Sequence, residues 1–122
     1  MNPFTISVEG RLTSDKVTWA AVRAMKKAGN TSGPFDGAMM VGMQFLIVRP
    51  RSHYENSKLL HDAPLYPTCE PDLTYLDRCV QEGLLGFVFK SDSQVCNKTC
   101  LKRYTDKVAS ATIEITPLLR EI

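Results

Sequence analysis

The chain has 122 residues, 43% of them hydrophobic, and a formal net charge of +2 at pH 7. This length can bury a real core but cannot hold two full domains, so we expect one domain over residues 1–122. The net charge is too small to argue for nucleic-acid binding by itself. No segment is long and apolar enough to span a bilayer and no export signal opens the sequence, so we expect a cytoplasmic protein without membrane contact.

The first half of the sequence predicts a strand, a helix and a second strand. Residues 4–10 alternate between apolar and polar side chains, as a half-buried strand does. A Thr-Ser-Asp cluster then begins a helix over residues 15–28, which ends at Gly29. The run M-M-V-G-M-Q-F-L-I-V lies within a predicted strand over residues 38–48. Because this run is apolar almost throughout, we expect both faces of the strand to be covered.

The second half predicts one helix and two strands. Leucine and valine side chains recur on one stripe of a 3.6-residue period over residues 73–85, and glycines near the end of this range indicate where the helix stops. Residues 95–104 and 110–116 are predicted strands, which we expect to pair as a closing hairpin. The elements together indicate an α+β fold with a small mixed sheet of about four strands packed with two helices.

Between these halves, residues 49–68 show no regular period and contain three prolines. A loop this long in a small domain is usually functional or mobile, so we expect a mobile basic loop here. Basic side chains gather in this loop and again in residues 98–107, on either side of an acidic segment, as a phosphate-binding surface requires. The predicted DNA-binding residues are Arg49, Arg51, His53, Lys58, Lys98, Lys102 and Arg103.

Three carboxylates around the second predicted helix point to metal chemistry. Glu70 and Asp72 are two residues apart, so their side chains share one face of an extended segment. Asp92 follows the helix and could fold back beside them. Carboxylate oxygens suit Mg²⁺ or Mn²⁺, and such a cation can polarise a phosphate and activate water. The simpler interpretation is that Asp72 caps the helix and Asp92 is a turn residue.

The segment P-D-L-T-Y-L-D-R-C-V-Q-E-G-L-L-G-F-V-F-K-S-D-S-Q-V resembles the RusA-like Holliday-junction resolvases, whose pattern is approximately K-P-D-L-D-N-L-x-K-x-x-x-D-A-L-N-G-x-x-x-x-D-D-S-Q-V. The resemblance is best over about residues 49–95. It implies a metal-dependent endonuclease that resolves four-way or branched DNA junctions by paired symmetric incision, acts as a homodimer and is encoded by a phage or prophage. It also implies that Asp72 and Asp92 bind Mg²⁺ or Mn²⁺ and that Arg78 takes the place of a catalytic lysine.

The sequence departs from this pattern at the site itself. Thr74 stands where the family has its second aspartate, and a threonine cannot supply an anionic ligand. Glu70 could compensate from the other side of Asp72, and Asp77 is a second candidate. Arg78 is permanently charged, so it cannot act as a general acid at neutral pH. The predicted catalytic residues are Asp72, Asp92, Arg78 and Glu70, and the predicted metal ligands are Asp72, Asp92 and Glu70.

Two other functions remain open. Thr74 favours a relative whose catalysis is weakened or lost and which acts as a DNA-junction-binding or protein-binding regulator. A less favoured interpretation is a small regulator that uses the methionine-rich strand and Trp19 for protein contacts. Incubating a labelled four-way junction with the protein, with and without Mg²⁺ or Mn²⁺, separates these interpretations from a nuclease.

Overall fold

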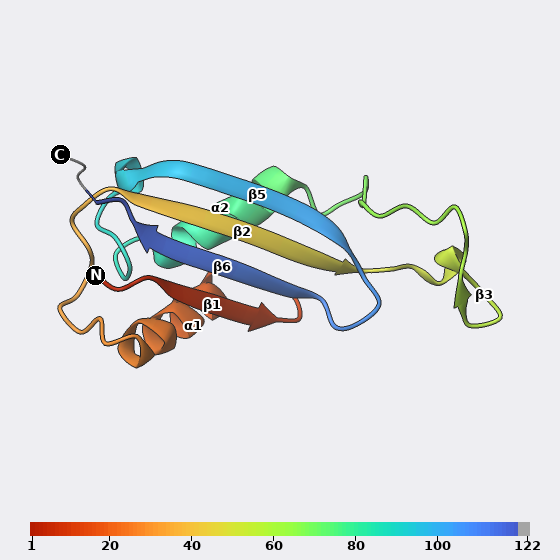
Figure 1. Ribbon diagram of the computed structural model, residues 1–122, viewed down its shortest axis with the longest axis horizontal. Coiled ribbons are helices and arrows are strands. Elements are labelled where there is room, and N and C mark those ends of the chain that lie inside the picture. The colour runs from red at the N-terminus through yellow and green to blue at the C-terminus, as the bar shows by residue number, and fades with distance from the viewer. Residues whose placement is uncertain (120–122) are drawn as a thin grey trace.

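The computed structural model describes residues 1–119 and has the α+β fold that the sequence predicts (Figure 1). A four-stranded mixed sheet carries two helices, and a two-stranded sheet lies apart from it. The elements in chain order are β1 (Phe4–Glu9), α1 (Ser14–Lys27), β2 (Met39–Val48), η1 (Arg51–His53), β3 (Tyr54–Glu55), β4 (Lys58–Leu59), α2 (Leu73–Leu84), η2 (Asp92–Gln94), β5 (Val95–Thr105) and β6 (Ser110–Pro117).

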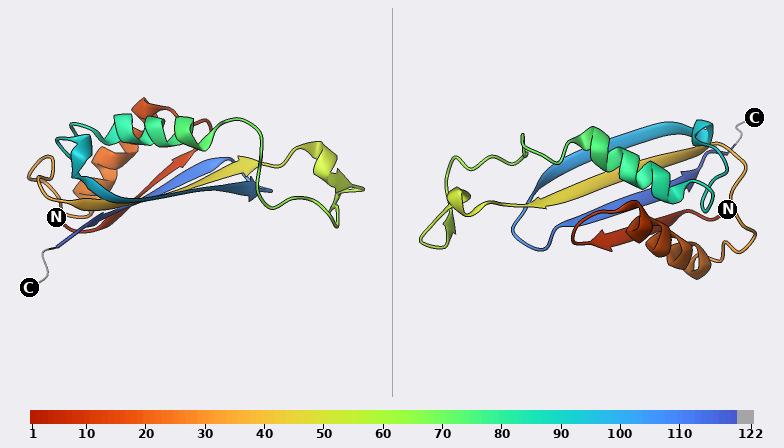
Figure 2. Two further views of the ribbon diagram at one scale, coloured as in Figure 1. Left: turned by 90° about the horizontal axis from the view of Figure 1, so that it is seen from above. Right: turned by 180° about the vertical axis from the view of Figure 1, so that it is seen from behind.

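The large sheet has the strand order β1-β6-β2-β5, in which β2 and β5 are parallel and β6 is antiparallel to both of its neighbours. The strands β1, β2 and β5 therefore run in one direction, and each helix carries the chain from one of them to the next. Both crossovers advance the same way across the sheet. Because such connections are almost always right-handed, both helices are expected on one face. Figure 2 shows α1 and α2 together on that face.

The predicted closing hairpin of residues 95–104 and 110–116 is wrong. Among the described residues, β5 pairs with β2 alone, and β6 lies between β1 and β2. The most apolar strand, β2, thereby gains a partner along both edges and is one of the two interior strands of the sheet. Ile113 of β6 stands opposite Ile6 on one side and Met43 on the other. The alternation of apolar and polar residues in a strand indicates which face of the sheet each residue takes. It does not indicate which strand is the neighbour, so the sequence could not show whether these two consecutive strands pair.

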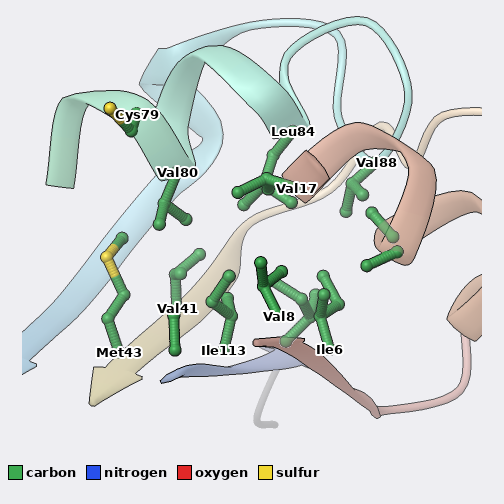
Figure 3. Packing of buried hydrophobic residues seen from close by; sticks show 14 of the residues in the cluster. Ile6, Val8, Val17, Val41, Met43, Cys79, Val80, Leu84, Val88 and Ile113 are labelled. Carbon is green, nitrogen blue, oxygen red and sulfur yellow. The ribbon is translucent and has the colours of Figure 1, made fainter. Parts of the chain in front are cut away.

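The hydrophobic core lies between the sheet and the two helices. Side chains that alternate along the strands point toward the helices, and Ile6, Val41 and Ile113 are fully buried there. Figure 3 shows Val17 of α1 and Leu84 of α2 reaching down to meet them. Both helical side chains are also fully buried. The apolar stripes that predicted the helices are thus the faces that cover the sheet.

The two helices touch at Gly83 of α2. A Cβ atom built there would lie 2.6 Å from the carbonyl oxygen of Ser14 and 2.6 Å from Cβ of Val17. The Thr18 hydroxyl donates a 2.7 Å hydrogen bond to the carbonyl oxygen of Gly83. Only a residue without a side chain permits this approach of two helices. The contact fixes how α2 sits on the sheet, and therefore where its polar face lies.

The opposite face of β2 is not covered by any described element, so the expectation that both faces are buried is wrong for the isolated chain. Met40, Gln44 and Leu46 point to this side and are only half-buried. Pairing with β5 places Leu101 beside Gln44, and Leu101 is 41% exposed. The helices cover a single face of the sheet, because both helical crossovers lie on that side. We call this the open face of the sheet.

Residues 50–68 extend beyond the end of the sheet and include η1, β3 and β4 (Figure 1). We call this segment the arm. It coincides with the predicted basic loop, but it has a defined shape with a short hairpin in which Tyr54 pairs with Leu59. Its predicted mobility stays a prediction. In the part of the chain that the structure describes, every helix is too short or too polar to cross a membrane.

Candidate active site

The carboxylate of Asp72 does not cap the helix that it precedes. Asp72 occupies the N-cap position of α2, with φ −67° and ψ 146°, yet its side chain makes no capping hydrogen bond. Both Asp72 and Glu70 are exposed. Lys102 holds the segment before the helix, because its Nζ donates to the carbonyl oxygens of Cys69 (2.8 Å) and Pro71 (3.0 Å). The simpler interpretation of Asp72 as a cap is therefore not realised.

The third predicted carboxylate lies elsewhere. Asp92 is in η2, and its Oδ1 accepts a 3.2 Å hydrogen bond from Nε2 of Gln81. Gln81 follows Asp72 by nine residues, which is about 13 Å along a helix axis. Figure 1 shows η2 at the end of α2 farther from its start. The structure thus separates Asp92 from Glu70 and Asp72, and residues 1–119 contain no group of three or more His, Cys, Asp or Glu side chains placed to hold a metal ion.

Gln94 explains why Asp92 sits where it does. Its Oε1 accepts hydrogen bonds from the backbone amides of Lys90 (2.8 Å) and Ser91 (2.9 Å). Its Nε2 donates to the carbonyl oxygens of Phe35 (2.7 Å) and Gly37 (3.0 Å). The side-chain amide thereby ties residues 90–94 to the segment before β2. Sequence reasoning missed this role, although Ser91 and Gln94 have the spacing of a capping box, which the structure contains.

The middle of α2 presents a polar stripe between these two ends. Thr74, Arg78 and Gln81 are spaced four and three residues apart, so they follow one another along one side of the helix. Arg78 is exposed. Beside this stripe, Lys98 of β5 donates to both carboxylate oxygens of Asp77 at 3.1 Å. Asp77, the second candidate for the missing ligand, is therefore already paired with a cation of its own chain.

The predicted DNA-binding residues fall into three groups. Lys98 and Lys102 make internal contacts to α2 and the segment before it, and Arg49 has a side chain only 7% exposed that pairs with Asp106. The geometry gives these three a role within the fold. Arg51 and Lys58 are exposed on the arm, and His53 is half-buried at its base. Arg103 pairs in register with Leu46, so it lies on the open face, away from α2.

A hollow of about 690 Å³ adjoins the start of α2. Its lining includes Leu12, Phe45 and Leu76 together with the two carboxylates, Glu70 and Asp72. Tyr75 also lines it and is 49% exposed. A hydrogen bond with Cys79 raises the pKa of Tyr75 above its ordinary value. The two carboxylates thus border a surface that is largely apolar rather than a wholly solvated one.

The sequence motif agrees with what comparison with known families finds. The family model for Endodeoxyribonuclease RusA matches residues 10–116 of this chain. A search of curated proteins gives no match. The matched range contains both helices, the arm and every predicted site residue. The chain therefore belongs to the RusA family of endodeoxyribonucleases, which resolve Holliday junctions and generally depend on a divalent metal.

Proposed function

We propose that this chain is a nuclease that resolves four-way DNA junctions by paired, symmetric incision and uses Mg²⁺ or Mn²⁺. The observation that carries the proposal is the exposed carboxylate of Asp72, which stands where the family motif has a metal-binding aspartate and makes no capping bond. A purely structural aspartate at an N-cap would be expected to bond the first turn. The free carboxylate supports a role in binding.

Glu70 and Asp72 have the donor chemistry that such a cation requires. Mg²⁺ is usually held by one or two carboxylates together with water and substrate phosphates, so a cage of three protein ligands is not needed. When bound, the cation would polarise the scissile phosphate and stabilise the negative charge on the leaving oxygen. Asp92 remains a proposed ligand. From its place beside Gln81 it could join the other two carboxylates only if residues 90–94 moved along α2.

The other polar residues would hold the DNA. Arg78 is exposed between the two ends of α2, and its guanidinium suits a phosphate because two N–H groups can bind two oxygens. It cannot deliver a proton at neutral pH. Arg51 and Lys58 on the arm are proposed to contact phosphates farther along a DNA arm of the junction. Such contacts fix the position of the duplex without reading its sequence.

Paired incision requires two sites related by a two-fold axis, which a homodimer supplies. The open face of the sheet is the proposed contact, because Met40, Leu46 and Leu101 leave apolar surface there that no described element of the chain covers. Leu46→Glu should convert a dimer to a monomer in sedimentation velocity. The control is Val22→Glu, an exposed apolar position on α1, which covers the other face of the sheet. A parent protein that is monomeric at micromolar concentration would contradict paired incision.

The alternative is a relative that binds junctions, or another protein, without cutting. Two observations favour it: Thr74 replaces an aspartate, and the described carboxylates form no three-membered cluster. One assay decides. A four-way junction labelled on each strand is incubated with the protein, with and without Mg²⁺ or Mn²⁺. Symmetric nicks in opposite strands support the nuclease, whereas a retarded but intact junction under every metal condition supports the binding protein.

A further inference from the structure

A cluster of side chains outside the hydrophobic core holds the arm at its base. Nε of Arg49 lies 3.3 Å from Oδ1 of Asp106, and the hydroxyl of Tyr54 donates a 2.6 Å hydrogen bond to the same oxygen. The bond to Asp106 raises the pKa of Tyr54, so the phenol keeps the proton that it donates. Asp106 belongs to the turn between β5 and β6. One carboxylate therefore ties the outgoing end of the arm to the sheet.

The returning end of the arm is tied to the same place. Nη1 of Arg49 donates a 2.7 Å hydrogen bond to the carbonyl oxygen of Pro64. The backbone amide of Tyr104 donates to the carbonyl oxygen of Leu65 at 3.0 Å. The guanidinium carbon of Arg49 lies 5.1 Å from the centroid of the Tyr104 ring, within the range of a cation–π contact. Arg49 thus bridges the two ends of the arm, and Asp106 neutralises its charge.

The arm carries exposed cations that this cluster does not use. Arg51 and Lys58 are exposed, and neither forms an ion pair within residues 1–119. A loop free to swing would place these charges at many positions and would lose that freedom on binding. A loop held at both ends presents them in one region, so less entropy is lost when they meet a ligand.

We infer that Asp106 and Arg49 are positioning residues, which set the direction of the arm so that Arg51 and Lys58 meet the phosphates of a DNA duplex bound along α2. The inference rests on the proposed function, because it takes junction DNA as the ligand. It assigns Arg49 an indirect role in DNA binding through the arm, in place of the direct phosphate contact that the sequence predicts. It also assigns a role in DNA binding to a negatively charged residue.

Because Asp106 is negatively charged, the effect of its charge on DNA binding can be separated from its effect on the position of the arm. Removing a carboxylate near DNA should by itself strengthen binding, since it lessens repulsion of phosphate. Asp106→Asn removes the charge but keeps an oxygen that can accept from Tyr54 and Arg49. Asp106→Ala removes the charge and the oxygen together. If positioning matters, Asp106→Asn should bind a four-way junction as tightly as the parent or more tightly, while Asp106→Ala should bind it about 10-fold more weakly.

Hydrogen exchange reports the arm directly and without DNA. In Asp106→Ala the amides of His53 and Leu60, which are hydrogen-bonded within the arm, should exchange faster than in the parent, while core amides of β2 should not. With metal and junction, Asp106→Ala should raise KM and leave kcat unchanged, because the site on α2 is intact. Tyr54→Phe removes one contact only, and it serves as the variant of choice if Asp106→Ala does not fold.

The control is a double variant, Arg51→Ala with Lys58→Ala. It should weaken junction binding and reduce the dependence of log Kd on log salt by about two, with arm exchange unchanged. Unchanged arm exchange in Asp106→Ala would overturn the inference, as would faster exchange with binding as tight as in Asp106→Asn. If the double variant also binds like the parent, the arm has no role in DNA binding and the inference fails. The proposed nuclease function is tested independently, by whether the parent protein cleaves the junction.

Discussion

Replacing Gly83 by alanine tests the helix contact that sets the orientation of α2. In an isolated helix this change stabilises by about 1 kcal/mol, because glycine has the greater backbone freedom to lose. Here the added methyl group would lie 2.6 Å from the Ser14 carbonyl oxygen and 2.6 Å from Cβ of Val17. Neither atom is at the end of a flexible side chain. The two helices must therefore separate or rotate, and we expect Gly83→Ala to destabilise the protein instead of stabilising it.

The size of the loss follows from three contributions. Overpacking a close contact costs about 1–3 kcal/mol. Separation also lengthens the 2.7 Å hydrogen bond from Thr18 to Gly83, a contribution of about 1 kcal/mol. Subtracting the gain in helix propensity leaves a decrease of about 2 kcal/mol in the free energy of unfolding. For a chain of this length the entropy of unfolding converts that decrease to a fall in Tm of about 8 °C.

Thermal and urea unfolding followed by circular dichroism would measure the change. Glu82→Ala is the matched control, since Glu82 is the neighbouring residue of α2, is exposed, and gains helix propensity without a clash. Its free energy of unfolding should stay within about 0.5 kcal/mol of the parent. A Gly83→Ala protein as stable as the parent would show that the helices can move apart freely, and the role given to this contact would be refuted.

Asp72→Asn and Asp92→Asn should each abolish junction cleavage while keeping or tightening binding, because each removes a ligand charge and lessens repulsion of phosphate; cleavage at the parental rate would contradict that residue's assignment. Thr74→Asp should lower the Mg²⁺ concentration needed for half-maximal cleavage and Glu70→Gln should raise it; no effect of Glu70→Gln would mean that Glu70 is not a ligand. Gln94→Glu should lower Tm, because a carboxylate cannot donate the two bonds that anchor residues 90–94 to the segment before β2; an unchanged Tm would show that this anchor does not contribute to stability.

Local pattern predicted the helices and the fold class. The expected helices 15–28 and 73–85 differ by one residue or less at each end from α1 (Ser14–Lys27) and α2 (Leu73–Leu84). Amphipathic periodicity is a property of neighbouring residues, so a short window of sequence contains it. The place of β6 depends instead on which strands compete for the edges of β2. The contacts between β2 and β6 join residues about seventy positions apart in the sequence, such as Met43 and Ile113. No local sequence pattern contains that information.

The sequence proposes which residues form the candidate site, but it does not predict how they are arranged. The motif proposes Asp72 and Asp92 as ligands, whereas the hydrogen bonds of Gln94 and Gln81 hold Asp92 at the far end of α2. No local sequence pattern records those bonds. Basic residues were harder to assign. A cluster of Lys and Arg in the sequence does not tell whether each charge meets DNA or a carboxylate of its own chain, and Lys98 and Arg49 meet Asp77 and Asp106.

The central position of β6 has a consequence for the order in which the chain can fold. The strands β1 and β2 are made early, yet they do not pair with each other, and the space between them is filled only by residues 110–117. A nascent chain that ends before these residues would leave both edges of β1 and one edge of β2 without partners, and such edges attract other chains. The sheet can therefore close only after residues 110–117 have been made, through contacts between distant parts of the sequence. Truncation before residue 110 is expected to give aggregation rather than a smaller folded protein.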